Sequence, residues 1–427
     1  MIIPQLSATM MAEEVPLPPS AAEIVPAPPL PLADQPSPQA VVMLLFTAYV
    51  LLPLSSALSA VLVLIASGWL FAWRRKRSLP AVPVASRLWL FLLAAVGLSA
   101  LFAVNKPDSW IGLVITGAYL IVIWVTVAAL DTPERYWQGM RLIFWGSVAW
   151  AAVGIVISLA RFQWNFNSAG IIITIGTWDH RANSIFMHPN MLAGYLLLTV
   201  GIGIALRTRE GFARRWRYNS GLAIVLLCQL LTQSRSGWIG TFVAILLAGL
   251  LVDRRLLIKS ALAFGVGLLF FYQMVWNRLL TLGASEFGSN LNRIRVWNSA
   301  WQMILDRPFF GFGPGSWRQV YPAFRDPLEW ENLPHAHSFF LHLGAEYGLS
   351  MLTALLLLIG IYSVRSIRDS WNTPWRDASL ALSFGVIGYL MLGAFEFIFS
   401  EGRNSILFFT LLGFLAATRR FANAPSS

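Results

Sequence analysis

The sequence predicts an all-α polytopic membrane protein whose helices cross a bilayer about twelve times. Hydrophobic residues make up 57% of the 427-residue chain, and charged residues make up only 12%. A soluble protein of this length needs more charge to cover its surface. Apolar stretches long enough to cross a bilayer, roughly 20 residues each, recur between polar loops. This composition excludes an ordinary soluble globular domain.

Twelve spans are expected, at 40–53, 55–73, 84–103, 109–130, 140–160, 189–206, 218–233, 236–252, 257–275, 336–364, 378–400 and 404–418. The first two share an uncharged run, residues 41–73, which is too long for one straight helix across the bilayer. Pro53 can break this run, so we expect a hairpin of two short helices there.

Lys and Arg set the expected orientation. Most of them fall in one set of alternating loops, at 74–77, 135–141, 207–217, 254–259, 365–376 and 419–420. Cytoplasmic loops are enriched in these residues, so this set and both termini are expected to face the cytoplasm. The net charge of +11 has the same explanation, and no nucleic-acid partner is expected.

Composition divides the chain into three parts. Residues 1–39 are rich in proline and contain no Lys or Arg, which predicts a disordered tail and not a signal peptide. A chain start downstream of Met1 explains the same composition equally well. Residues 40–420 form the predicted transmembrane domain, and residues 421–427 form a short C-terminal tail.

Two long segments on the outer side, 161–188 and 276–335, are where we expect the functional site. Long loops escape the rule that places positive charge inside, so the arginines of the second segment do not overturn the orientation. Loops of this length within a compact domain are usually functional.

Polar residues stand near the end of the first long segment and in a short connection between two later spans. Arg181, His188 and Asn190 end the first long loop, where Pro189 fits the first turn of a span. His188 is interpreted as part of an ordinary helix start, whereas Arg181 stands in loops otherwise poor in positive charge. Arg235 lies in a very short, serine-flanked connection between two spans. Charge near the membrane is costly, so we favour a function for Arg235 over simple snorkelling.

The second long loop carries Arg293, Arg295 and Trp297 in a stretch whose apolar spacing predicts a short amphipathic helix on the membrane surface. A lipid-surface helix alone would explain its aromatic residues. The run of glycine and proline at 311–315 is expected to form a tight turn that shapes the site.

His335 and His337 stand where the second loop returns to a hydrophobic span. If a helix begins near His335, Gly344 and Gly348 share the face of His337, which predicts close packing along that face. His335 is expected only to cap the helix start.

His342 and Glu346, four residues apart, are expected to pair with each other on a different face. Sequence alone gives this pair a structural part.

The residue types on this face indicate phosphate chemistry. Arginine is always charged and donates hydrogen bonds in a fork that suits phosphate oxygens. Histidine exchanges a proton near neutral pH. Arg181, Arg235, Arg295 and His337 therefore predict a site for a lipid-linked phosphate or pyrophosphate, with its headgroup in water and its tail in the bilayer.

Over roughly residues 180–360 the chain resembles the O-antigen ligase / polysaccharide polymerase superfamily of bacterial inner-membrane glycosyltransferases. The resemblance rests on the order and spacing of four motifs: Arg181 with Phe186-Met-His-Pro-Asn-Met-Leu-Ala193; Ser234-Arg-Ser-Gly-Trp238; Arg295-Val-Trp297 with Asp306-Arg-Pro-Phe-Phe-Gly-Phe-Gly-Pro-Gly315; and His337-Ser338 with Gly348. Met351 departs from the pattern, which usually has a second glycine there, and we expect slightly altered helix packing.

The resemblance implies a GT-C type fold with a large periplasmic loop that contains short helices. It also implies an inverting, metal-independent transfer of a glycan from undecaprenyl pyrophosphate to a sugar hydroxyl, in ligases that of lipid A–core. The protein would be a multi-pass protein of the cell inner membrane with its site facing the periplasm. No metal or other cofactor is expected.

Carried onto this chain, the resemblance implies that Arg181, Arg235 and Arg295 bind the pyrophosphate and stabilise its charge as it leaves. His337 would orient or deprotonate the acceptor hydroxyl. Supporting parts are expected for three further residues: Asn190, His335 and Arg293.

Other functions stay open. A polysaccharide polymerase or a protein O-oligosaccharyltransferase of the same superfamily would share the donor and differ in the acceptor. A transporter would place ionisable residues near the middle of the bilayer and often has repeated halves. The expected spans are nearly uncharged and no repeat is evident, so the transporter ranks last.

Overall fold

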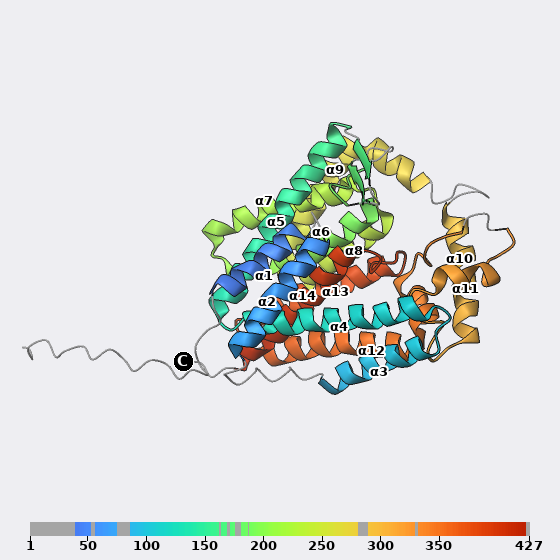
Figure 1. Cartoon of the computed structure of the whole chain (residues 1–427). Coiled ribbons are helices and arrows are strands. Elements are labelled where there is room, and N and C mark those ends of the chain that lie inside the picture. The colour runs from blue at the N-terminus through green and yellow to red at the C-terminus, as the bar shows by residue number, and fades with distance from the viewer. Residues whose placement is uncertain are drawn as a thin grey trace, which may run out of the picture. The chain divides into compact units, whose positions relative to one another are not determined.

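A computed structural model of the chain describes residues 39–52, 56–74, 86–161, 164–168, 171–175, 181–186, 188–280, 289–328 and 332–423. The tail expected at 1–39 lies outside these ranges except for Gln39, and so do the last four residues of the expected C-terminal tail, 424–427. The described part contains fourteen α-helices, one 3-10 helix and one two-stranded hairpin (Figure 1).

The helices are α1 (Gln39–Leu51), α2 (Ser56–Arg74), α3 (Ser86–Leu101), α4 (Lys106–Ala129), α5 (Pro133–Leu159), α6 (Pro189–Arg209), η1 (Phe212–Arg214), α7 (Arg215–Leu231), α8 (Arg235–Leu251), α9 (Arg254–Leu280), α10 (Ser289–Asp306), α11 (Trp317–Phe324), α12 (Phe339–Ser370), α13 (Arg376–Gly393) and α14 (Gly402–Ala422). Each of the twelve expected spans falls on one of them, and the run 41–73 forms two helices.

Five of the helices, α4, α5, α6, α12 and α14, are long and apolar enough to cross a membrane. The chain is therefore a helical membrane protein, and spanning by the other helices stays a prediction. The all-α expectation missed the antiparallel hairpin of β1 (Trp164–Ser168) and β2 (Ile171–Ile175) in the first long loop.

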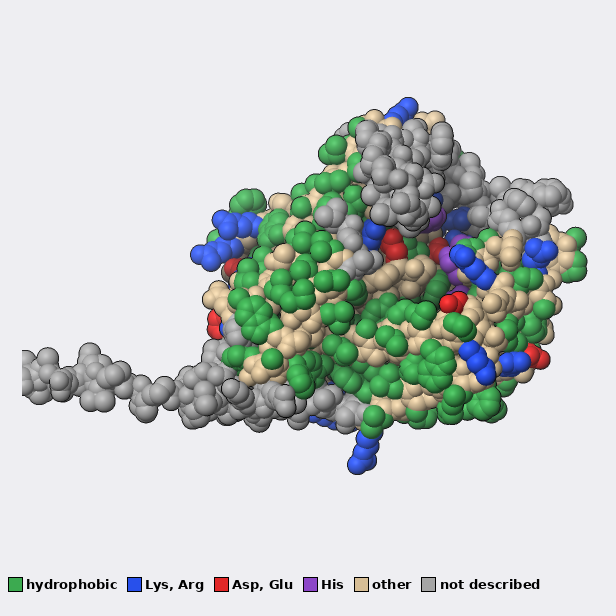
Figure 2. Space-filling model, viewed as in Figure 1, with side chains coloured by type: hydrophobic (Ala, Val, Ile, Leu, Met, Phe, Trp, Pro, Cys, Tyr) green, Lys and Arg blue, Asp and Glu red, His purple; other side chains and the backbone are tan. Residues whose placement is uncertain are grey.

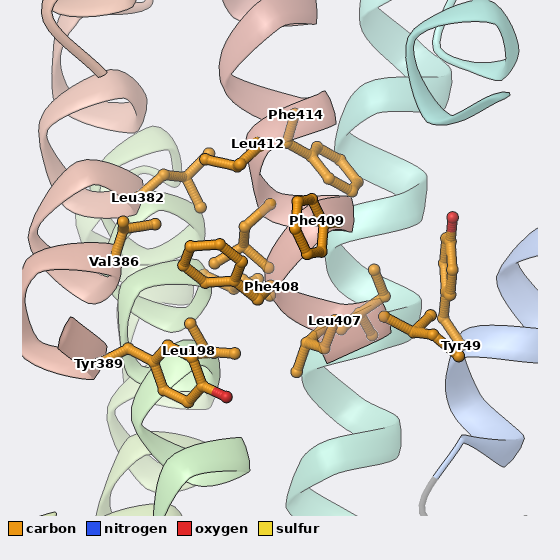
Figure 3. Packing of buried hydrophobic residues seen from close by; sticks show 14 of the residues in the cluster. Tyr49, Leu198, Leu382, Val386, Tyr389, Leu407, Phe408, Phe409, Leu412 and Phe414 are labelled. Atoms are coloured by element: carbon orange, nitrogen blue, oxygen red, sulfur yellow. The ribbon is translucent and has the colours of Figure 1, made fainter. Parts of the chain in front are cut away.

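The main hydrophobic core lies where α14 packs against its neighbours (Figure 3). Phe408 of α14 contacts Tyr389 of α13, with 5.4 Å between the ring centroids. The Tyr389 hydroxyl donates to the carbonyl of Ile398, at 3.0 Å. The core is thereby tied to the loop that joins α13 to α14.

Glycines bring α6, α8 and α13 into backbone contact. A Cβ built on Gly240 of α8 would lie 2.4 Å from the carbonyl oxygen of Gly388 on α13. Three residues earlier on α13, a Cβ on Gly201 of α6 would lie 3.2 Å from the Cα of Gly385. Small residues at such crossings let membrane helices approach closely, which gains packing energy that lipid contacts do not supply.

Helices α6 and α8 run in the same direction. Gly237 lies against Ala193 in the first turns of both helices, and Gly240 lies against Leu197 one turn farther along. Helix α13 runs in the opposite direction, since its last turns pack on the first turns of both. The start of α6, the start of α8 and the end of α13 therefore lie together.

Helices α12 and α14 also begin at this end of the bundle. Phe339, the first residue of α12, packs on Gly393, the last residue of α13. In the first turn of α14, the Asn404 amide Nδ2 donates to the carbonyl of Met191 in α6, at 2.9 Å. A helix N-terminus carries a partial positive charge. Four of them, from α6, α8, α12 and α14, make this end of the bundle favourable for anions.

Helix α12 is broken at Gly348, whose φ is 79° and ψ is 168°. The break frees backbone carbonyls for the glycine run of the preceding loop: the amides of Phe312 and Gly313 donate to the carbonyls of Ala345 and Glu346, at 3.0 and 2.8 Å. Positive φ angles at the glycines of this run, 64° at Gly311 among them, allow its tight course. The glycine run and the break in α12 thus form one interlocked unit.

Two expectations about the start of α12 are wrong. The helix begins at Phe339 with Ser338 as its N-cap, so His335 does not cap it. His337 has a φ of 47° and lies outside the helix, so it shares no helical face with Gly344. The prediction that His337 shares a face with the glycines is wrong because the helix begins at Phe339 and not near His335.

The short helix predicted around Trp297 is α10, and its apolar face packs on protein. Val296, Met303 and Ile304 are buried against α11 and α12, whereas Trp301 is half exposed. The sequence interpretation was that the aromatic residues of this helix face lipid. That interpretation does not apply to the buried face of α10, which packs on α11 and α12.

The predicted pairing of His342 with Glu346 is confirmed, with Nε2 and Oε2 separated by 3.4 Å. Both side chains are buried. Oε1 of Glu346 also accepts the backbone N–H of Trp317, at 2.8 Å, so the pair fastens α11 to α12.

Replacing Gly348 by alanine is expected to destabilise the fold by about 1–3 kcal/mol, because the left-handed backbone is strained for alanine. Its Cβ would also lie 2.2 Å from the carbonyl oxygen of Phe309. Gly360→Ala in the same helix is the matched control, since nothing lies within 4 Å of a Cβ there. Thermal unfolding of the purified variants measures the difference. Equal melting temperatures would contradict the interlock.

Candidate functional site

A buried carboxylate in the loop between α13 and α14 forms the centre of the candidate site. Glu396 is 2% exposed. Its Oε1 lies 3.0 Å from Nδ1 of His337, and its Oε2 accepts a hydrogen bond from Nδ2 of Asn190 at 2.6 Å. Arg293 of α10 approaches Oε2 at 3.5 Å. Segments from distant parts of the sequence therefore meet at one side chain.

The Glu396 carboxyl is ionised at neutral pH despite its burial. Burial alone would raise its pKa, but the hydrogen bond with His337 and the positive charge of Arg293 outweigh burial and lower the pKa to about 2. The carboxylate beside the His337 ring therefore carries a negative charge at neutral pH.

Three contacts fix His337 in place. Its φ of 47° is uncommon for a residue other than glycine and is a strain that functional sites often hold. Its backbone N–H donates to Nδ1 of His335 at 3.3 Å, and its carbonyl accepts the indole N–H of Trp297 at 3.4 Å. With Nδ1 of the His337 ring on Glu396, Nε2 is the nitrogen left for a ligand. The side chain is 25% exposed, so a ligand can reach it.

His335 is a neutral acceptor that supports His337. Burial lowers its pKa to about 3. A neutral ring keeps the lone pair on Nδ1 that accepts the His337 backbone N–H. The supporting part expected for His335 thus has a physical basis different from helix capping.

Arg181 joins the start of α6 to the connection between α7 and α8. It is buried, and its Nε donates to the carbonyl of Thr232 at 2.8 Å. Nη2 of the same guanidinium group donates to Oδ1 of Asn190 at 3.2 Å. Asn190 therefore links Arg181 to Glu396 through the two ends of its amide.

His188 caps α6, as expected of an ordinary helix start: its Nδ1 accepts the backbone N–H of Asn190 at 3.2 Å. Burial lowers the pKa of His188, and the charge of Glu396 opposes this only in part. The ring is thus a neutral acceptor close to the cluster.

Arg235 is the first residue of α8, directly after the N-cap Ser234. Thr232, whose carbonyl binds Arg181, lies three residues earlier. Because α6, α8 and α12 all begin at the same end of the bundle, Arg235 and His337 lie on one face of the protein.

The two arginines of α10 have different surroundings. Arg295, expected to bind pyrophosphate, donates to the carbonyl of Leu328 at 2.9 Å. Arg293, expected only to support the site, is the one that approaches Glu396. Positions two apart on a helix point in different directions, and the sequence did not fix the helix phase relative to the site.

Glu396 was missed by the sequence analysis. The expected span 378–400 hid it, but α13 ends at Gly393 and Glu396 lies in the loop beyond. The signal was present: a single carboxylate flanked by Phe395 and Phe397 in an apolar run. An ionisable residue in such a run is usually functional.

His335, His337 and Glu396 also offer donor atoms for a metal ion. One ligand atom each from His335, His337 and Glu396 lie within 4.8 Å of one another, and imidazole with carboxylate suits zinc. The surrounding charge opposes a cation, because the Arg293 guanidinium lies 3.5 Å from the same carboxylate. The Arg293 guanidinium therefore competes with a cation for the Glu396 carboxylate.

Figure 2 shows that this face of the molecule is hollowed. Histidine, acidic and basic side chains gather at the upper margin of the hollow, and hydrophobic side chains form its floor. The hollow thus offers a polar surface and an apolar surface to the same ligand.

Comparisons with known proteins bear on this site. Residues 220–359 match the family model described as O-antigen ligase. This range contains Arg235, Arg293 and His337 but neither Arg181 nor Glu396.

Similarity to individual proteins is more distant. The ComP-specific O-oligosaccharyltransferase of Acinetobacter baylyi (strain ATCC 33305 / BD413 / ADP1) is 22% identical over 241 residues, which cover 52% of this chain and 42% of that relative. The chain thus spans less than half the length of the curated relative. A chain from the structure "Structural coordination of polymerization and crosslinking by a peptidoglycan synthase complex" is 17% identical, with a TM-score of 0.44 over 79% of this chain and 98% of that one.

Lowering the pH is expected to destabilise the folded protein through His335. The unfolded chain takes up a proton near the ordinary pKa of 6.5, whereas the folded protein resists protonation until about 3. The stabilising contribution is therefore complete above pH 6.5 and is lost as the pH falls toward 3. Thermal unfolding across this pH window measures the loss. His335→Asn should show a shallower decline, and identical pH profiles for the two proteins would count against this role.

Proposed function

We propose that the chain belongs to the O-antigen ligase superfamily, which the match of residues 220–359 supports, and that it transfers a glycan from undecaprenyl pyrophosphate to the hydroxyl of an acceptor. In its ligase form the acceptor is a sugar of lipid A–core, at the periplasmic face of the cell inner membrane. The observation that carries the proposal is the contact of His337 with the Glu396 carboxylate, at 3.0 Å, beside Arg293. In this proposal His337 acts as the base, and nearby arginines supply permanent positive charge for the same reaction.

The first part of the proposed mechanism is proton removal by His337. With Nδ1 held by Glu396, Nε2 accepts the proton of the acceptor hydroxyl. The hydroxyl oxygen attacks the anomeric carbon, and the bond from that carbon to the pyrophosphate oxygen breaks. The electron pair stays on the pyrophosphate, and attack opposite the leaving group inverts the anomeric centre. Glu396 holds the imidazole in the required tautomer and stabilises the imidazolium that forms.

The second part is neutralisation of the leaving pyrophosphate. Arg181, Arg235 and Arg293 supply positive charge, and the four helix N-termini add their dipoles. Arg293 lies beside Glu396, whereas Arg295 donates to the carbonyl of Leu328, so the proposal gives the role of Arg295 to Arg293. In this scheme the arginines replace the charge that a divalent metal supplies in other transferases.

A protein O-oligosaccharyltransferase is the second candidate, since the curated relative is named as one. A polysaccharide polymerase has the same donor chemistry and differs only in the acceptor. A transporter is disfavoured because the ionisable cluster lies at the helix ends and not midway along the spans.

Glu396→Gln is expected to lower kcat by about 10²–10⁴-fold, because the amide removes the charge that orients His337 and stabilises its protonated form. The KM for the donor should change little. Steady-state kinetics on purified protein measure both values. Glu401→Gln, at the other acidic residue of the same loop, is the matched control and should retain activity. Equal turnover by the Glu396 variant and the wild type would remove this residue from the mechanism.

The function is tested with purified protein, lipid-pyrophosphate-linked glycan and EDTA, in the presence of lipid A–core or a protein acceptor. Transfer to the core supports the ligase, transfer to protein supports the oligosaccharyltransferase, and chain extension without an acceptor supports the polymerase. Chelation is expected to leave turnover unchanged, whereas loss that added Zn²⁺ restores would contradict the metal-independent scheme.

Arg235→Ala and His337→Ala provide the loss-of-function controls for this assay. Both should abolish transfer while the protein still folds and inserts normally. Arg235→Lys should also be impaired, because an ammonium group cannot reproduce the two-pronged contact of a guanidinium. Turnover at the wild-type rate in these variants, or no transfer by the wild type to any acceptor, would overturn the proposal.

A further inference from the structure

An apolar cavity of about 310 Å³ adjoins the polar site. It lies between α3, α4, α12 and α14, under the loop that carries Glu396. Aliphatic and aromatic side chains form most of its wall, among them Leu92, Ile115, Leu343, Met351, Phe397 and Phe409. Its lining offers no charged side chain to a ligand.

Phe397 separates the cavity from the polar site. It directly follows Glu396 in the chain, and its ring lines the cavity. The ring centroid lies 3.9 Å from that of His342 and 5.8 Å from that of His335. Only the Phe397 side chain therefore separates a ligand in the cavity from the cluster of His335, His337 and Glu396.

The exposure of the lining residues shows where the cavity opens. Ile115 on α4 is 44% exposed and Ser400 in the α13–α14 loop is exposed, whereas Met351 and Leu355 of α12 are buried. The opening therefore lies between α4 and this loop, and Met351 lies deeper. Because α4 is apolar and long enough to cross a membrane, its exposed side faces lipid.

We propose that this cavity holds the isoprenoid segment of the donor lipid next to its pyrophosphate. The inference rests on the proposed function and adds where the donor tail binds. A mostly apolar wall suits a hydrocarbon ligand. The headgroup and tail of one lipid are covalently joined, which matches a polar site and an apolar cavity separated only by Phe397. The volume is at the lower end for ligand pockets, so the remainder of the chain lies in the bilayer.

Met351 sets the depth of the cavity. It lies three residues after the break at Gly348, and its side chain is 5% exposed. Its flexible thioether can adapt to an alkyl or isoprenoid ligand. The departure from the glycine of the superfamily motif, expected only to alter helix packing, therefore places a side chain in the wall of the cavity.

Filling the cavity by Met351→Trp is expected to raise the KM for a glycan on undecaprenyl pyrophosphate about tenfold, with kcat within about twofold, because ground-state binding is lost. The KM for the same glycan pyrophosphate carrying a methyl group in place of the lipid should not change. Leu357→Trp on the same helix is the matched control, since Leu357 is 53% exposed and outside the cavity.

A second variant keeps the proposal testable if Met351→Trp fails to fold. Ile115→Trp at the opening should raise the KM for the lipid donor in the same way. Unchanged KM in a folded cavity variant would overturn the proposal. An equal rise for the methyl-bearing donor would also overturn it, because the defect would then lie in the polar site.

Direct binding separates this proposal from the proposed function. Undecaprenyl pyrophosphate without a glycan should raise the melting temperature of the wild type, and Met351→Trp should reduce that shift. This result would support the cavity even if the wild type transferred no glycan. An equal shift with phosphatidylglycerol would identify an ordinary membrane lipid as the occupant and overturn the proposal.

Discussion

The architecture of the candidate site depends on one buried negative charge. A carboxylate removed from water is strongly unfavourable unless charged or hydrogen-bonding partners surround it. Glu396 finds them in Asn190 of α6, Arg293 of α10 and His337 before α12. These partners can meet only if the ends of several helices are in register. The glycine contacts between α6, α8 and α13 let their backbones approach closely enough for that register.

The long outer loop is as much a part of the fold as the membrane helices. The break in α12 at Gly348 provides the carbonyls to which the glycine run binds. This attachment holds α10 over the bundle, where Trp297 binds the carbonyl of His337 and Arg293 approaches Glu396. Attachment of this kind positions an imidazole and a guanidinium with more precision than a freely moving segment.

Local signals made much of this molecule predictable. The positions of the helices follow from hydropathy, and the pairing of His342 with Glu346 follows from their spacing of four. Glu396 carried a local signal, a carboxylate in an apolar run, but the partners that define its surroundings lie in distant segments. Which arginine of α10 lies beside Glu396 likewise depends on how the helix docks. Long-range packing, which no local pattern encodes, decided both.

Glu396 and Phe397 are consecutive residues with opposite surroundings, one polar and one apolar. Their Cα atoms are only about 3.8 Å apart, as in any two residues joined by a trans peptide. One short stretch of backbone therefore contributes a wall to the apolar cavity and the central carboxylate to the polar cluster.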